Sequence, residues 1–252
     1  MMSERVRIIS WNIRAGGGRR VDEIAENIER WRADVVALSE FRGTPPSGLL
    51  KELLGRRGLS FQLSTAGNGV PASNCILLAS RWPLRIVRLR AAPAEPGRWC
   101  LAQVAAPRPL TLGAMHVPNR ISGRKYPFHA AVLDVVRSWR RGPALLVGDA
   151  NSGRIGLDEQ VPCFSKREDR WLCALDDVRW RDAFRHLHGD ERAYTWYSPN
   201  GRNGFRLDQA FVNRPLLPRL VDARYEWAFG ANDDERRDTV SDHAALIVDL
   251  EA

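Results

Sequence analysis

The sequence is poor in cysteine and has no long apolar run. Its four cysteines contain no Cys-x-x-Cys pair, which argues against a disulfide framework and against a zinc site. No apolar run approaches the ~20 residues that span a bilayer, and the polar residues 1–5 lead directly into an apolar segment without a signal-peptide core. We therefore expect a cytoplasmic protein with reduced thiols and no membrane partner.

Lysine is also scarce, and one stretch lacks acidic residues. Only three of the 38 basic residues are lysines, and the formal net charge is +8. A positive balance favours a polyanionic partner such as nucleic acid, although an arginine excess can also reflect genomic base composition. No acidic residue falls between Glu52 and Glu95, while six arginines do. A positive face on the amino-terminal half and an ordinary solvated basic surface both fit this pattern.

No linker rich in Pro, Gly or Ser divides the 252 residues, so we expect one domain, 1–252, with a large core. We expect this domain to act as a monomer. Apolar spacing at 3.6 residues predicts helices, and short apolar runs between turn residues predict strands. The predicted helices lie near 21–31, 49–54, 128–139 and, in pieces, 171–187. The predicted strands lie near 6–11, 35–39, 75–79, 84–89, 100–105, 110–115, 145–147, 205–212, 219–227 and 244–250, the four between 75 and 115 as an antiparallel meander.

Polar side chains stand at the edges of four apolar runs. Asn12 follows the first run, Glu40 follows the second, the pair Asp149 and Asn151 follows a third, and Asp242-His243 precedes the last. Strand ends of this kind deliver ionisable groups to one rim of a sheet. The set is rich in hard oxygen donors and contains no thiolate, which predicts Mg²⁺ or Mn²⁺ rather than Zn²⁺.

Eight short motifs in a fixed order carry a family resemblance. They are Ser10-Trp11-Asn12, Ser39-Glu40, Ser80-Arg81-Trp82-Pro83-Leu84, His116, Gly148-Asp149-Ala150-Asn151, Tyr194-Thr195-Trp196, Arg206-Leu207-Asp208 and Ser241-Asp242-His243. From about Arg5 to Leu250 the chain resembles the endonuclease/exonuclease/phosphatase superfamily. That superfamily includes exonuclease III-like AP endonucleases, DNase I-like nucleases, neutral sphingomyelinases and inositol polyphosphate phosphatases. The resemblance implies a four-layer α/β sandwich, with two mostly antiparallel sheets packed face to face and flanked by helices.

The resemblance also implies a ligand set for the divalent cation. Glu40, with Asn12 and Asp242 beside it, would hold a Mg²⁺ or Mn²⁺ ion. The ion would neutralise a phosphate oxygen and stabilise the charge that builds up in the transition state.

The remaining polar motifs resemble the family's catalytic groups. Asp208 would fix the imidazole tautomer of His243 and hold the ring against the scissile phosphate. Asp149 and Asn151 would position and activate the attacking water. The sequence leaves open which group is the general base.

Four further residues are candidates for contact with the substrate, and two of them also have a structural interpretation. His116 stands where exonuclease III-like enzymes usually carry Tyr and where DNase-like enzymes and phosphatases carry His. We assign it to phosphate contact or leaving-group protonation, with a structural role as the alternative. Arg120 and Lys125 follow on a loop that would reach flanking phosphates. Trp196 would either stack on a base or sugar, or belong to the core.

Three functions fit these residues. The first is a Mg²⁺-dependent nuclease or phosphodiesterase acting on DNA, like exonuclease III, an AP endonuclease or DNase. The second is a phosphoesterase for a small or lipid phosphate, favoured by His116. The third is a non-catalytic relative that binds nucleic acid, which has no need for a complete set of catalytic residues. We expect the first, with DNA as the substrate partner.

Overall fold

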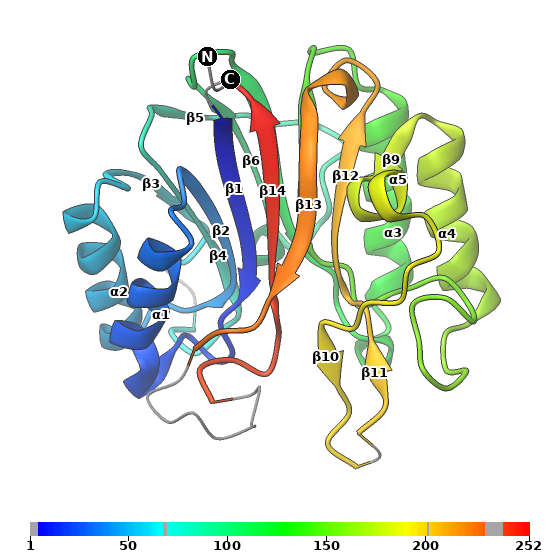
Figure 1. The fold of residues 1–252 in the computed structure, drawn as a ribbon, viewed down its shortest axis with the longest axis horizontal. Helices are drawn as coiled ribbons and strands as arrows, with labels where there is room; N and C mark the ends of the chain where they lie inside the picture. The colour runs from blue at the N-terminus through cyan, green and yellow to red at the C-terminus, as the bar shows by residue number, and fades with distance from the viewer. Residues whose placement is uncertain (1–4, 68–69, 201, 230–238) are drawn as a thin grey trace.

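Two six-stranded sheets pack face to face in the computed structural model, which describes residues 5–67, 70–200, 202–229 and 239–252 (Figure 1). Across the first sheet the order is β13 (Leu220–Glu226), β14 (Ala245–Glu251), β1 (Arg5–Asn12), β2 (Val35–Phe41), β4 (Cys75–Ser80) and β3 (Phe61–Ser64). Across the second it is β5 (Leu84–Ile86), β6 (Trp99–Val104), β7 (Leu110–His116), β8 (Ala144–Asp149), β12 (Asp208–Asn213) and β9 (Trp180–Asp182). Among the strands of the described residues, only β1/β2 and β7/β8 are parallel pairs, so the expected mostly antiparallel sheets are confirmed.

The inner strands β4, β8 and β12 are buried on both faces, which explains why their sequences are nearly continuous apolar runs, whereas the edge strands β3, β5 and β13 are partly exposed. On β1, Val6 and Ile8 point between the sheets, while Ile9 and Trp11 point outward. Helices cover the outer faces and complete the four layers (Figure 1). Helices α1 (Val21–Arg30) and α2 (Pro45–Arg56) cover the first sheet, and α3 (Lys125–Arg137) and α4 (Lys166–Asp177) cover the second. The short α5 (Ala183–His188) adds Phe184 to the central core.

One end of the sandwich collects the strand ends that carry polar residues. The parallel pairs β1/β2 and β7/β8 finish there, and the antiparallel strands β12 and β14 begin there. The hairpin of β10 (Trp196–Tyr197) and β11 (Gly204–Phe205) extends from the same end, whereas the start of β1 and the end of β14 lie at the opposite end (Figure 1). The topology therefore delivers the predicted functional residues to one rim.

The predicted meander between 75 and 115 is wrong in one respect. Strand β4 pairs with β2 and β3 in the first sheet, whereas β5, β6 and β7 form a meander in the second. The chain changes sheets at residues 81–83, between the end of β4 at Ser80 and the start of β5 at Leu84, and Pro83 in this connection has no backbone donor. Within the ranges that the structure describes, no helix has the length and apolarity to cross a membrane.

Candidate active site

A cavity of about 390 Å³ opens at the rim where the polar strand ends meet. Seven of the residues predicted from sequence line it: Glu40, His116, Asp149, Asn151, Trp196, Asp242 and His243. Two others stand directly behind this lining. Asn12 is buried against Glu40 and Asp149, and Asp208 is buried against His243. Segments more than 200 residues apart in the sequence therefore contribute to one site.

Asn12 joins the two sheets beneath the cavity. Its Nδ2 lies 3.2 Å from Asp149 Oδ2 and 3.4 Å from Glu40 Oε1, and its Oδ1 accepts a hydrogen bond from the Arg14 amide at 3.0 Å. Glu40 sits at a bulge in the β2/β4 ladder with φ 56°, and its Oε2 accepts from the Ala15 amide at 2.8 Å. A bulge re-aims a side chain, and a left-handed non-glycine residue is strained. The fold holds Glu40 in this costly conformation so that its carboxylate faces the cavity.

His243 and Asp208 form the hydrogen-bonded pair that the sequence predicts. His243 Nδ1 and Asp208 Oδ2 are 2.8 Å apart, and both side chains are buried. Asp208 is held at the start of β12 because Thr195 Oγ1 accepts hydrogen bonds from the backbone amides of Leu207 and Asp208. Burial lowers the pKa of His243, but the Asp208 carboxylate outweighs burial and raises the pKa to about 10. The Nδ1 contact leaves the opposite ring nitrogen, Nε2, for a ligand in the cavity.

Asp149 lies between the imidazole of His116 and the backbone of Asn151. His116 Nε2 is 3.7 Å from Asp149 Oδ2, and the Asn151 amide donates to Asp149 Oδ1 at 2.9 Å. Burial raises the pKa of Asp149, and burial together with the nearby charge of Arg98 holds the pKa of His116 well below its usual range. His116 is therefore neutral at physiological pH and can either accept or donate one hydrogen bond. Asn151 has φ 45°, and its Nδ2 donates to the Val117 carbonyl at 2.8 Å, which orients the amide.

The donor set of the cavity suits a hard divalent cation. Glu40, Asp149 and Asp242 bring three carboxylates to one cavity, where like charges repel unless a cation lies among them. Within the described ranges, no three His, Cys, Asp or Glu side chains are gathered closely enough to hold a metal by themselves. The residues therefore fit a Mg²⁺-type ion that takes the rest of its oxygen ligands from water or substrate.

Lys125 and Arg120 do not line the cavity. The Lys125 ammonium is buried and donates to the Asn151 carbonyl and to Glu168 Oε1. Arg120 is exposed and donates to the Cys163 carbonyl at 3.3 Å. The prediction that Lys125 contacts a flanking phosphate does not fit this geometry. Its ammonium group is buried beneath the site, and Glu168 neutralises its charge. Lys125 instead positions the backbone of Asn151.

Trp196 lies at the cavity wall, half-buried, and its Nε1 is 3.3 Å from Asp242 Oδ2. It is therefore not a core residue. The cavity residues that were missed in the sequence include Arg98, whose Nη1 is 3.4 Å from the His116 carbonyl, and Asn74. Asn74 directly precedes β4, so a polar residue at a strand edge was the signal. Arg98 stands beside β6 without a motif and becomes recognisable only once β6 and β7 pair.

The comparisons with known proteins agree with this geometry. The model of the Endonuclease/Exonuclease/phosphatase family matches residues 9–243, and the protein belongs to that family. Among curated protein sequences, none matches the chain. Similar solved structures include a 3′ phosphatase from Neisseria bound to a product DNA hairpin, a 3′-5′ exonuclease from Neisseria meningitidis and an AP endonuclease from Archaeoglobus fulgidus. Each has a TM-score of 0.79 over 98% of this chain and 100% of the other, at 20%, 21% and 20% identity respectively, and so shares the fold.

Proposed function

We propose that the protein is a divalent-metal-dependent hydrolase of phosphate ester bonds in DNA, a nuclease or a related processing enzyme. One observation carries the proposal: a buried Asp208–His243 pair, a buried Asp149 and a strained Glu40 converge on one cavity. Polar groups that are buried, strained and mutually oriented cost stability and are typical of catalytic sites. A protein that only binds nucleic acid does not need polar groups in this buried and strained arrangement.

The roles of the residues follow from their positions. Glu40, Asn12 and Asp242 would hold the cation, which supplies charge neutralisation at the phosphate and at the leaving oxygen. His243, charged and oriented by Asp208, would donate a hydrogen bond from Nε2 to a phosphate oxygen. Asp149 and Asn151 would orient the attacking water.

DNA is the substrate that the surroundings favour. The cavity contains the arginines Arg98 and Arg124 beside the catalytic groups, and the whole chain carries a net charge of +8. Guanidinium groups beside a phosphoester site suit a backbone with several phosphates. The similar Neisseria 3′ phosphatase was solved with a DNA hairpin. Trp196 at the cavity wall offers an aromatic surface to a sugar or base.

A second candidate is a phosphoesterase for small or lipid phosphates. His116 favours it, because the family resemblance places His at this position in phosphatases, and the neutral imidazole lines the cavity, 3.7 Å from Asp149 Oδ2, where it can hydrogen-bond a phosphate oxygen. A panel of duplex DNA, abasic duplex, single-stranded DNA, RNA, sphingomyelin and inositol phosphates separates the candidates. We expect DNA to be cleaved in Mg²⁺ and spared in EDTA. Cleavage of the small phosphates alone would select the second candidate, and EDTA-resistant cleavage would remove the metal from the proposal.

A matched pair of variants tests the site itself. We expect Glu40→Gln to reduce DNA turnover by about two or more orders of magnitude, because it removes a charged ligand while keeping the shape of the side chain. Glu26→Gln, on the exposed face of α1, makes the same chemical change away from the cavity and should leave turnover unchanged. Equal turnover of the two variants would contradict the assignment of Glu40.

A further inference from the structure

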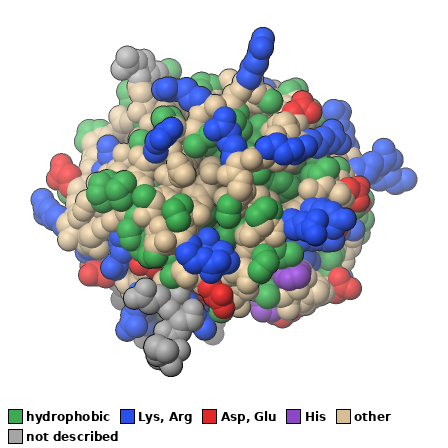
Figure 2. Space-filling model, turned by 90° about the horizontal axis from the view of Figure 1, so that it is seen from above, with side chains coloured by type: hydrophobic (Ala, Val, Ile, Leu, Met, Phe, Trp, Pro, Cys, Tyr) green, Lys and Arg blue, Asp and Glu red, His purple; other side chains and the backbone are tan. Residues whose placement is uncertain are grey.

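Surface charge does not single out further functional residues in this protein. Lys and Arg side chains are spread over the end of the sandwich opposite the catalytic cavity, with fewer acidic side chains among them (Figure 2). Buried polar contacts are more specific, because burying an amide or a hydroxyl costs free energy unless the group is hydrogen-bonded. One such group is the side chain of Gln209, which directly follows Asp208 on β12.

Gln209 joins two segments that carry catalytic groups. Its side chain is fully buried, and its Nε2 donates a hydrogen bond to the Ser152 carbonyl at 2.8 Å. Ser152 is also fully buried and directly follows Asn151 in the chain. The Gln209 amide therefore connects the strand that begins with Asp208 to the turn that carries Asp149 and Asn151.

The turn after β8 depends on contacts from other parts of the chain. Asn151 has φ 45°, a left-handed conformation that is costly for a residue other than glycine. The backbone groups of residues 150, 151 and 152 are each held by a hydrogen bond from outside the turn. The pairs are Ala150 with the Leu207 carbonyl, Asn151 with Lys125, and Ser152 with Gln209. Gln209 therefore holds the last residue of a turn whose backbone is strained.

Stability alone does not account for an amide at this position. Gln209 Nε2 has a second, longer contact with the Arg206 carbonyl at 3.3 Å, but Oε1 has no hydrogen-bond partner among the residues that the structure describes. A buried acceptor without a partner costs free energy, and an apolar side chain of the same length avoids that cost. The benefit of the amide therefore lies in its contact with the Ser152 carbonyl.

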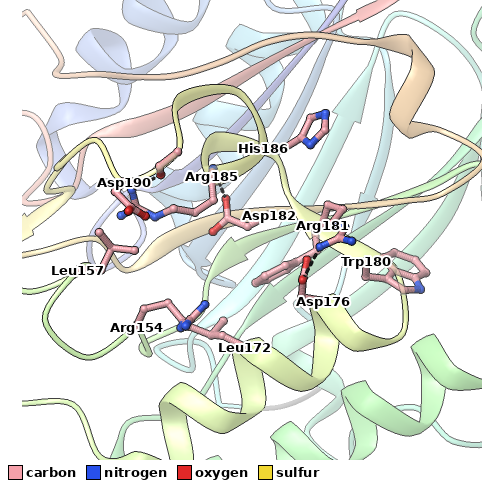
Figure 3. A pocket seen from close by; sticks show the side chains of 12 residues that line it. Arg154, Leu157, Leu172, Asp176, Trp180, Arg181, Asp182, Arg185, His186 and Asp190 are labelled. Atoms are coloured by element: carbon pink, nitrogen blue, oxygen red, sulfur yellow. Dashed lines mark hydrogen bonds and ion pairs between the residues drawn. The ribbon is translucent and has the colours of Figure 1, made fainter.

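The start of β12 is held independently of the Gln209 amide. The buried Arg206 forms ion pairs with Asp158 at 2.7 Å and with Asp182 at 2.6 Å. Asp182 also lines a cavity of about 370 Å³ between α4, β9 and α5 (Figure 3). Because these ion pairs keep the segment before β12 in place, we expect removal of the Gln209 amide to displace the turn after β8 rather than Asp208.

We propose that Gln209 is a positioning residue for the hydrolase, which sets the water-orienting turn relative to the Asp208–His243 pair. The inference rests on the proposed function and extends it to a residue that does not line the catalytic cavity. The attacking water and the phosphate group must be held in a reactive geometry, and a displacement of about 1 Å can lower the rate about 100-fold. Gln209 acts on this geometry through the Ser152 backbone and does not touch the substrate.

The variant Gln209→Met tests the proposal, because methionine keeps the length of the side chain and removes the amide. We expect kcat on duplex DNA in Mg²⁺ to fall by about 10- to 100-fold, with KM within about twofold of the unaltered protein, since the substrate contacts remain. Gln62→Met is the matched control. Gln62 also donates to two backbone carbonyls, at 2.8 and 3.0 Å, but lies on β3 outside the cavity. Equal kcat values for the two variants would overturn the proposal.

Two further variants separate positioning from a general loss of stability. Gln209→Asn keeps an amide but is one methylene too short to reach the Ser152 carbonyl, so it should show the same loss of kcat; full activity of this variant would refute the role of the contact. In an Asn151→Ala background, Gln209→Met should lower kcat by about threefold or less, because a group that the turn positions is already missing. Reductions that multiply in the double variant would show that Gln209 acts elsewhere.

Amide hydrogen exchange, followed by mass spectrometry, tests the contact without any substrate. We expect the peptide that contains residues 150–152 to exchange at least about 10-fold faster in Gln209→Met, because the turn opens more readily without this contact. The same peptide should exchange normally in Gln62→Met. Unchanged exchange in Gln209→Met would refute the proposal. A protein that cleaves another phosphoester instead of DNA would refute the proposed substrate alone, and the kinetic comparison then applies to that phosphoester.

Discussion

Replacing Asp208 by Asn isolates the contribution of the Asp208–His243 hydrogen bond. The substitution keeps the shape of the side chain but removes the charge that holds His243 Nδ1 at 2.8 Å. A charge-assisted hydrogen bond contributes about 1.5–3 kcal/mol, and each 1.36 kcal/mol is a factor of ten in rate. We therefore expect kcat on duplex DNA to fall by about 10- to 150-fold while KM changes little.

The fold should survive this change. Asp208 is fully buried and its Oδ1 has no hydrogen-bond partner among the residues that the structure describes, so an amide in its place removes a buried charge without opening a cavity. Circular dichroism and thermal melting check this point. Asp134→Asn on the exposed face of α3 is the matched control. A folded Asp208→Asn variant whose kcat stays within twofold of the control would refute the role assigned to the pair.

Three other perturbations have expected outcomes. Lys125→Met should lower kcat by releasing the Asn151 carbonyl and should destabilise the fold by up to about 3–5 kcal/mol, because the buried Glu168 loses its ammonium partner and keeps only the more distant guanidinium of Arg120, at 3.8 Å; denaturant melts and kinetics together check both effects, and an unchanged melt would contradict them. Burial raises the pKa of Asp158, but the buried Arg206 and the half-buried Arg185 outweigh burial and leave the pKa lowered. The stability from this carboxylate is therefore complete above about pH 4, the unfolded pKa, and is lost as the pH falls through the lower folded value; acid unfolding of Asp158→Asn should lack this component. Gly148→Ala should prevent folding, since its Cβ would stand 1.8 Å from a β7 carbonyl oxygen, and soluble expression with a normal melt would show that the strands can separate.

The sequence predicted the parts of the fold that depend on local pattern. The apolar runs identified β1, β2, β8 and β14, and the spacing of Phe128, Val132 and Val136 identified α3, because each signal lies within one element. The sequence did not show that β4 and β5 belong to different sheets. That division depends on which strands pair, and pairing joins residues far apart in the chain.

The site followed the same rule. Asn12, Glu40, Asp149 and Asp242 were predictable because a polar residue at the edge of an apolar run is a local signal. The burial of Lys125 was not, since its partner Glu168 is contributed by another helix. Arg98 was missed for the same reason, because it reaches the cavity only through the pairing of β6 with β7. The strained backbone of Glu40 could not be predicted from the sequence either, because a bulge changes the pairing of the strands without requiring particular residue types.

The position of β14 between β13 and β1 has a consequence for biosynthesis. β1, the first of the described strands in chain order, pairs with β14, the last of them, so the ladder that includes Arg5↔Glu251 closes only once β14 has been synthesised. His243 lies two residues before that strand, and we expect its imidazole to reach the Asp208 carboxylate only after β14 docks. A nascent polypeptide on the ribosome would thus carry a nearly finished sandwich with no assembled catalytic centre. The proposed hydrolase activity would therefore begin only after β14 has been synthesised.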